Sequence, residues 1–371
     1  MKLSLNTIAA ISFISGTAYA EDDSPFAGEF VYTPELWTVA SGGLERSSRY
    51  LHNFDVMFEW DLSKSGLDGG TIFIYGLSNN KSELSGDIVG DLQTVSNIDN
   101  GEVYRLEEAW YQQEFSGGRV KLGLIDLNTE FDAIDTGGFF INSSHGIGPD
   151  FSQTGENGPS IFPSTSPAIM LEMTVSEQLR FRAGVFDAVP NDPNYPMKTK
   201  VSLGEGALYV AEINYVAGYD IRFALGGYRY SSKFDSLLTG VPEDGNGGIY
   251  AIVEAQLSDR LSGWVRAGFA NSIVNPLSHY LGGGFLLSKP FARRDNDQLG
   301  FSIATAWNGD DMKQLLLTEG SKPANAEYNF ELSYNYFVND KITIQPDVQY
   351  IVNVGGTKDL ANALVLDFSL L

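Results

Sequence analysis

Six basic residues occupy positions where they could share one polar surface. Arg180 and Arg182 alternate with Leu179, Phe181 and Ala183, and successive side chains of an extended chain point to opposite faces. Each guanidinium carries five N–H donors in a fixed fork, which suits the hydroxyl groups of a polar solute. The same fork suits the carboxylates of neighbouring strands, in which case the basic residues would only form ion pairs within a protein wall. The other residues with this placement are Arg119, Lys121, Arg222 and Arg266.

Patterns for covalent or metal chemistry are weak. Glycoside hydrolysis needs two carboxylates about 5–10 Å apart across one bond, whereas the adjacent acids Glu107 and Glu108 are expected to point to opposite faces of a strand. The three histidines are scattered and cysteine is absent, so a zinc site is not expected. No G-x-S-x-G motif occurs. The sequence therefore predicts no enzyme, no metal and no cofactor.

The elements expected to position these side chains are β-strands. In residues 327–338, Tyr328 and Phe330 fall on one face while Asn329 and Glu331 fall on the other. Several such segments run to ten or more residues, the length that a tilted strand needs to cross a bilayer. About sixteen segments alternate in this way: 28–41, 48–62, 70–78, 103–116, 119–126, 167–175, 179–187, 207–216, 220–231, 247–258, 262–271, 278–288, 297–307, 326–338, 341–353 and 361–371.

The connections between these segments alternate between short and long through most of the chain. This rhythm is typical of transmembrane barrels, which have short periplasmic turns and longer extracellular loops. We therefore predict an all-β fold, a transmembrane antiparallel β-barrel of about sixteen strands. The short connections are 116–118, 176–178, 217–218, 259–261 and 339–340, and the long ones are 79–102, 127–166, 188–206, 232–246 and 308–325.

The first twenty residues are expected to be a signal peptide that is removed. Lys2 precedes a short apolar stretch, residues 8–14, and Ala18-Tyr19-Ala20 has the small-x-small pattern of a cleavage site. Residues 21–371 are then expected to form a single barrel domain, in which the longest connection, 127–166, folds inward as a constriction loop.

Charge limits the partners. The chain has 24 basic and 47 acidic residues, a net charge of −23, and binding to nucleic acid depends on basic charge. No nucleic acid partner is expected. A barrel of this kind would be surrounded by outer-membrane lipid and lipopolysaccharide, and the sequence leaves open whether it is a monomer or a homotrimer.

Several stretches resemble the carbohydrate-selective porins of the OprB type. The most specific are residues 146–153 (GIGPDFSQ) and 345–350 (QPDVQY). Val354 departs from the family, which usually has proline there, and the chain ends in Leu371 rather than in an aromatic residue. Further similar stretches are 128–132, 140–144, 159–163, 182–193, 297–300 and 362–366.

The resemblance implies a sixteen-stranded porin in the outer membrane of a Gram-negative bacterium. Such a channel would pass small sugars, monosaccharides such as glucose among them, by passive diffusion. The alternatives are a general porin without sugar selectivity, a structural or adhesin-like barrel and, less favoured, a barrel enzyme of the outer membrane.

The family pattern E-A-W matches Glu108-Ala109-Trp110 and suggests that Glu108 and Trp110 face the lumen. An indole packs well on the apolar face of a sugar, and a carboxylate accepts hydrogen bonds from hydroxyls. Trp110 could equally belong to an aromatic girdle at the membrane interface. In the constriction loop, Asn142, His145 and Asp150 offer donors and acceptors that would line the narrow part of the pore or only close the loop.

Overall fold

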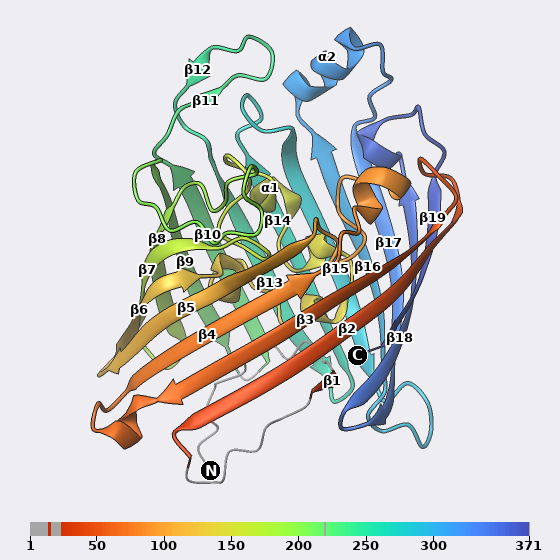
Figure 1. Cartoon of the computed structure of the whole chain (residues 1–371). Helices are drawn as coiled ribbons and strands as arrows, with labels where there is room; N and C mark the ends of the chain where they lie inside the picture. The colour runs from red at the N-terminus through yellow and green to blue at the C-terminus, as the bar shows by residue number, and fades with distance from the viewer. Residues whose placement is uncertain (1–13, 16–23, 219, 371) are drawn as a thin grey trace.

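An antiparallel sheet that closes on itself forms the wall of the molecule (Figure 1). The computed structural model describes residues 14–15, 24–218 and 220–370. Within these residues each ring strand pairs with the next along the chain, and the ring closes where Phe368 of β19 pairs with Leu36 of β2. The ring strands are β2 (Phe26–Ser41), β3 (Ser48–Asp61), β4 (Gly70–Asn79), β5 (Val103–Phe115), β6 (Gly118–Ile125), β7 (Ser166–Thr174), β8 (Leu179–Asp187), β9 (Ala207–Ala217), β10 (Ile221–Tyr230), β13 (Gly247–Ser258), β14 (Leu261–Ala270), β15 (Leu277–Ser288), β16 (Gln298–Asn308), β17 (Ala326–Asn339), β18 (Ile342–Val352) and β19 (Ala363–Leu370).

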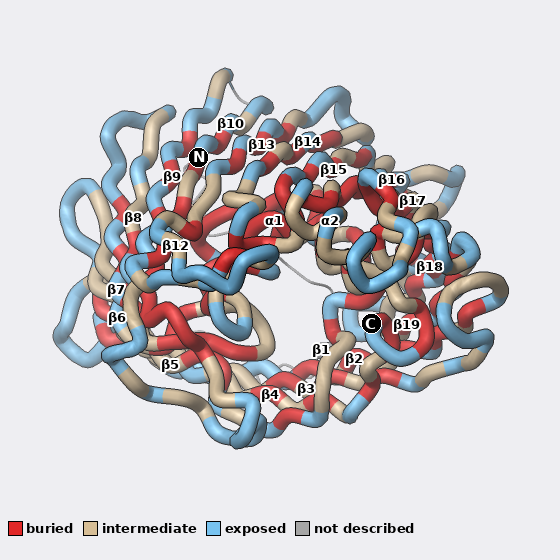
Figure 2. The backbone as a smooth tube through the Cα atoms, turned by 90° about the horizontal axis from the view of Figure 1, so that it is seen from above, coloured by how far each residue is buried: buried red, intermediate tan, exposed pale blue. Residues whose placement is uncertain are grey.

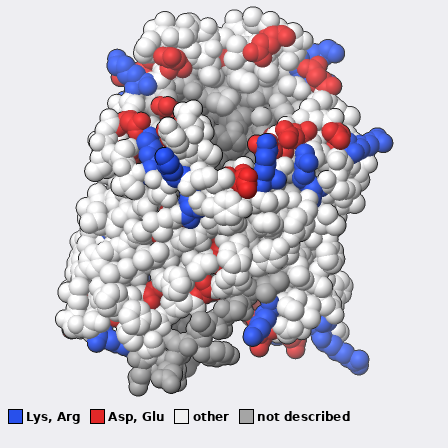
Figure 3. Space-filling model, viewed as in Figure 1, with Lys and Arg blue, Asp and Glu red and all other residues white. Residues whose placement is uncertain are grey.

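The prediction of sixteen antiparallel strands is confirmed, and each strand end lies within two residues of its expected place. The alternation has the expected cause. On β17, Leu332 and Tyr336 are 48 % and 41 % exposed on the outside, whereas Glu331 and Ser333 are fully covered on the inside. Figure 3 shows charged side chains gathered towards the two ends of the molecule, with a mostly uncharged belt between them. The belt is the surface that a membrane requires.

The longest connections gather at one end of the barrel, the upper end in Figure 1. We name two of them: L2 is residues 80–102 and L3 is residues 126–165. The connections and their flanks contain the helices η1 (Leu62–Ser65), η2 (Ser85–Val89), η3 (Leu127–Thr129), η4 (Gly137–Phe139), η5 (Ser143–His145), α1 (Pro149–Ser152), α2 (Asp310–Thr318) and η6 (Val354–Gly356), and the small hairpin β11 (Phe234–Asp235) and β12 (Pro242–Glu243).

Two apolar clusters lie inside the ring, where loops meet the inner surface of the wall. In one, Phe131 and Phe151 of L3 pack with Phe186, Tyr228 and Trp264 from the strands. The view along the barrel shows buried residues inside the ring around α1 (Figure 2). Loop residues thus supply part of the core.

L2 contributes to the second cluster. Leu84, Ile88 and Val95 pack against Trp37 of β2 and Ile351 of β18. The sequence predicted an inward fold for residues 127–166, but the strand pattern did not indicate that L2 also packs inside the ring. The apolar residues within residues 84–98 are the signal that could have shown it.

The expected signal peptide lies almost entirely outside the described residues, so its removal stays a prediction. The described part, β1 (Ile14–Ser15), pairs with Val31 and Tyr32 of β2. None of the helices in the described ranges has the length and apolar character that crossing a membrane requires.

Candidate functional site: the inner walls under L3

Side chains of β6, β8, β10 and β14 form what we call the basic wall. It consists of Arg119, Lys121, Arg180, Arg182, Arg222 and Arg266, the six residues that alternation had placed together. Each shares a face with inward neighbours, as Arg222 does with the buried Ala224 and Tyr228. The strands therefore bring the predicted basic residues to one side of the interior.

Two of these residues hold the start of L3 through Glu130. The Arg119 guanidinium lies 2.6 Å from a Glu130 carboxylate oxygen, and the Lys121 ammonium donates to the other oxygen. Burial would raise the pKa of Glu130, but Lys121 and Arg119 outweigh burial and lower it to about 2. Glu130 therefore remains a carboxylate across the physiological pH range.

The middle of the wall repeats this arrangement. Arg182 binds Glu172 at 2.5 Å and donates to the Glu130 carbonyl of L3 at 2.7 Å. Arg222 binds Glu254 and donates to the carbonyl of Ala133, also in L3. These two guanidinium groups thus neutralise wall carboxylates and tie down the loop backbone at the same time.

Arg180 differs from its neighbours. Within the described residues, its guanidinium has no hydrogen-bond or ion-pair partner, although it lies two residues from Arg182 on the same face of β8. Its donors are unused by the protein parts that the structure describes.

Arg266 is fully buried between two carboxylates of L3. Its guanidinium lies 2.7 Å from Asp132 and 2.5 Å from Asp150. The GIGPDFSQ stretch has glycine at 148 for a steric reason, since a Cβ there would lie 2.2 Å from Arg266 Nη1. Gly268 on β14 likewise leaves room for Asp150, whose oxygen would lie 2.0 Å from an added Cβ. The predicted loop residue Asp150 therefore meets a predicted wall residue in a closed ion cluster.

Glu108 and Trp110 lie together on the inner face of β5. The indole N–H donates to a Glu108 oxygen at 3.1 Å, and Asp126 at the start of L3 donates its backbone N–H to the same carboxylate. Phe73 stacks on one side of the indole at 4.9 Å, and the Lys121 ammonium lies 4.0 Å from the ring centre. The indole is held as part of the wall in this arrangement.

The expectation that Glu107 and Glu108 point to opposite faces is wrong. The register of β4 and β5 shifts between Tyr75 and Gly76, which leaves Glu107 as an extra residue of a bulge. Glu107 is fully covered and Glu108 is 7 % exposed, so both point inward. Both carboxylate oxygens of Glu107 lack a hydrogen-bond partner among the described residues.

Asn142 and His145 lie across the interior, near the side chains that we call the acidic wall: Glu35, Glu331, Asp347 and Asp367 of β2, β17, β18 and β19. Glu331 accepts the backbone N–H groups of Ile141 and Asn142, at 2.6 and 3.2 Å. The Asn142 amide donates to Gln349 at 3.2 Å. Loop L3 is thus attached on both sides of the barrel.

His145 is buried with its Nε2 atom 2.8 Å from the Ser302 hydroxyl and 3.3 Å from Glu331. Burial lowers the pKa of His145 to about 3, so the imidazole is neutral at neutral pH. Across the described residues, no group of three or more acidic or histidine side chains is arranged to hold a metal ion.

The strand pattern did not indicate which acids pair with the basic wall. Glu130 and Asp132 lie in the stretch 128–132 that carries part of the family resemblance, and that was the available signal. Glu172 and Glu254 sit opposite Arg182 and Arg222 in register on neighbouring strands. That pairing is readable only once the register is known.

Comparison with known proteins agrees with this architecture. Residues 45–370 match the family described as "Carbohydrate-selective porin, OprB family". The chain belongs to the OprB family. Porin B of Pseudomonas aeruginosa is 25 % identical over 389 residues, covering 90 % of this chain and 84 % of that protein.

Solved structures show the same fold. The high-pH structure of Pseudomonas putida OprB superposes with a TM-score of 0.82 at 22 % identity, covering 93 % of each chain. The low-pH structure of that protein superposes with a TM-score of 0.57 at 18 % identity, covering 93 % of this chain and 91 % of that one. This OprB-family chain is an outer-membrane porin of a Gram-negative bacterium through which small carbohydrates diffuse, and it is a channel rather than an enzyme.

Proposed function

We propose that L3 forms the constriction of this porin and that the basic wall supplies the hydrogen bonds that favour monosaccharides such as glucose. The observation that carries the proposal is the attachment of L3 to both inner walls, through Arg266 on one side and Glu331 on the other. A loop fixed at two opposite points stays in the interior and narrows it.

The hydroxyl contacts are assigned to Arg180 and Arg182. Arg180 has no partner among the described residues, and Arg182 uses its Nε and Nη1 atoms, which leaves Nη2 without a hydrogen bond to described residues. Guanidinium donors suit sugar hydroxyls. Arg119 uses both Nη atoms and Arg222 uses all three guanidinium nitrogens in hydrogen bonds to described residues, so these two would add weaker contacts.

Trp110 has a supporting role in this proposal. Phe73 and Lys121 pack against its ring, so a sugar could stack on the indole only after displacing one of them. Arg266, Asn142, His145 and Asp150 are buried and would act by holding L3 in place.

The test is sugar block of ion current in planar bilayers. Replacing both assigned residues (Arg180→Gln with Arg182→Gln) removes two donors worth about 1 kcal/mol each or less, so the glucose concentration for half-block should rise ~10-fold. Arg260→Gln, in an exposed short turn, is the matched control and should change nothing. An unchanged half-block in the double variant would show that these residues do not contact sugar.

The constriction is tested separately by shortening L3. Removing residues 133–148 should raise single-channel conductance and admit larger sugars in liposome swelling. Unchanged conductance in a variant that still inserts would rule out L3 as the narrow part of the pore.

A further inference from the structure

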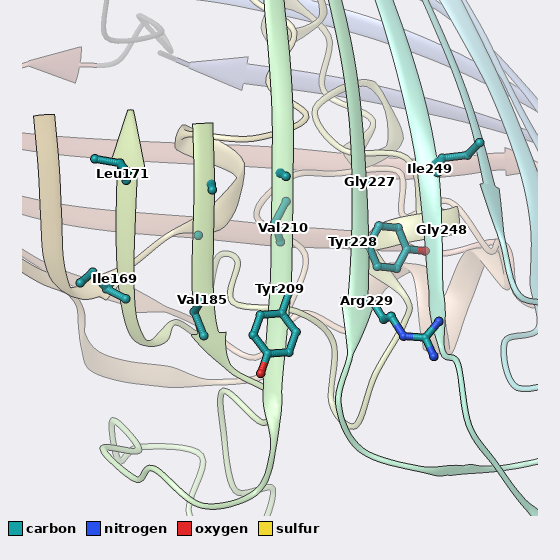
Figure 4. A pocket seen from close by; sticks show the side chains of 13 residues that line it. Ile169, Leu171, Val185, Tyr209, Val210, Gly227, Tyr228, Arg229, Gly248 and Ile249 are labelled. Atoms are coloured by element: carbon teal, nitrogen blue, oxygen red, sulfur yellow. The ribbon is translucent and has the colours of Figure 1, made fainter. Parts of the chain in front are cut away.

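A groove of about 670 Å³ runs across the outer surface of the barrel over β7 to β13 (Figure 4). Its rims are apolar and exposed, and they include Ile169, Leu171, Val185 and Ile249. These side chains alternate with the inward basic residues, so the groove belongs to the membrane-facing surface and is separate from the lumen. Neither the sugar pathway nor L3 accounts for it.

The groove arises from a row of small side chains. Ala183, Ala211 and Gly227 are direct neighbours in register on β8, β9 and β10. Larger residues stand at both ends of this row, Leu171 beside Ala183 and Ile249 beside Gly227. Three small residues in succession between two large ones leave a depression across the strands.

A cation stands at the edge of this depression. Arg229 lies in the next row, paired in register with Tyr209, and both side chains are exposed on the outer face. In the part of the chain that the structure describes, the Arg229 guanidinium has no hydrogen bond and no ion pair. An exposed guanidinium without a partner among the described residues offers its N–H donors to an anion from outside the chain.

The location identifies the membrane leaflet. Arg229 is one residue from the end of β10, and the long connection 231–246 follows it. Long connections of outer-membrane barrels lie on the cell exterior, so the groove faces the outer leaflet close to the head-group level. Tyr209 suits this depth because tyrosine is enriched where membrane meets water.

We propose that this groove binds a phosphorylated lipid of the outer leaflet, a lipopolysaccharide molecule, with an acyl chain over Ala183, Ala211 and Gly227 and a phosphate on Arg229. Guanidinium and phosphate form strong, two-pronged hydrogen bonds, and the Tyr209 hydroxyl lies on the same rim to donate a further one. A second copy of this chain fits less well, because the residues that line the groove include no carboxylate to pair with Arg229.

The test is native mass spectrometry of the full chain in detergent with added lipopolysaccharide. The unaltered chain should retain one tightly bound molecule. Filling the groove with Ala211→Leu, or removing the cation with Arg229→Gln, should lower retention at least ~10-fold. Arg229→Lys should keep most of it, and dephosphorylated lipopolysaccharide should bind the unaltered chain as weakly as intact lipid binds Arg229→Gln.

Ala267→Leu is the matched control, because Ala267 faces outward on β14 outside the groove. Equal retention by all variants would overturn the proposal, and so would loss of an oligomer in place of lipid in Ala211→Leu. Each variant is first shown to be folded by its heat-dependent shift on gels. Since none of these residues lines the lumen, sugar block should be unchanged, which separates this test from that of the proposed constriction.

Discussion

The contacts of L3 differ between the two inner walls of the barrel. On the basic wall, cations of the strands meet carboxylates and carbonyls of the loop, as Arg266 meets Asp132 and Asp150. On the acidic wall the roles are reversed, because the strand residue Glu331 accepts two backbone N–H groups of the loop. One wall holds L3 by charge pairing and the other by carboxylate–amide hydrogen bonds.

The difference matters for stability. Each ion pair of the basic wall neutralises both partners, whereas backbone amides leave the carboxylates of the acidic wall without a counter-charge. Asp347 and Asp367 are direct cross-strand neighbours, and like charges in that position destabilise a sheet. Both oxygens of Asp347 also lack a hydrogen-bond partner among the described residues. Loss of a paired charged group from the basic wall should therefore lower the stability of the barrel. Loss of one from the acidic wall should raise it.

The largest effect is expected from Arg266→Ala. It leaves two buried carboxylates without their cation, which destabilises by about 3–5 kcal/mol, and it frees one attachment of L3. Thermal unfolding in detergent should shift to lower temperature, and single-channel current should become noisier. Arg180→Ala removes an inward arginine without a described partner and is the control; an equal loss in both variants would mean that pairing with L3 is not what Arg266 contributes.

Asp347→Asn should raise the stability of the barrel, whereas Arg266→Ala lowers it. The amide cannot take on a negative charge facing Asp367, and it adds N–H donors for its buried surroundings, so at neutral pH we expect a gain of about 1–3 kcal/mol, the usual penalty of an unsatisfied buried group. Denaturant unfolding of the detergent-solubilised barrel measures it. Asp340→Asn, the same change at an exposed position in the turn between β17 and β18, is the control and should leave stability unchanged. A clear loss of stability in Asp347→Asn would show that the acidic wall is satisfied as it stands.

These contrasts show how far the sequence alone reaches. Strand positions and faces were predictable because alternation of apolar and polar residues fixes both, as in residues 327–338. The bulge at Glu107 was not, because it depends on the register with β4. The partner of Arg266 was not predictable either, since Asp132 is 134 residues away in the chain and one of many acids. The residue types indicated that ion pairs would form inside the barrel. Only the closed fold shows which basic and acidic residues form them.

A pH dependence should come from His145, on the side of L3 that meets the acidic wall. Its pKa is about 3 in the folded chain against roughly 6.5 when unfolded. Between these values only the unfolded state takes up the proton, so stability falls as pH falls, by up to ~1.4 kcal/mol per pH unit. Burial raises the pKa of Asp91 in L2 to about 6, and that group acts in the opposite direction between pH 6 and 4.

Comparing the pH dependence of stability in the unaltered chain and in His145→Gln isolates the contribution of the histidine. We expect the free energy of unfolding in urea, measured at pH 7, 6 and 5, to fall more steeply in the unaltered chain than in the variant as the pH is lowered. Parallel curves would mean that the imidazole is protonated in the folded state beside Glu331, and L3 would then have a charge pair on this wall too.

The smallest effect is expected at the rim, where charge pairing occurs without burial. Lys233 and Asp244 lie 3.1 Å apart in the outer connection 231–246, and their side chains are 61 % and 71 % exposed. Water screens such a pair and side-chain entropy opposes it, so Lys233→Ala should change stability by less than about 1 kcal/mol. Added salt should remove the remaining effect of this variant while leaving that of Arg266→Ala nearly intact, because buried charges are screened far less. If instead Lys233→Ala matched Arg266→Ala, the strength of the basic wall would have to be attributed to the number of its charges rather than to their enclosure under L3.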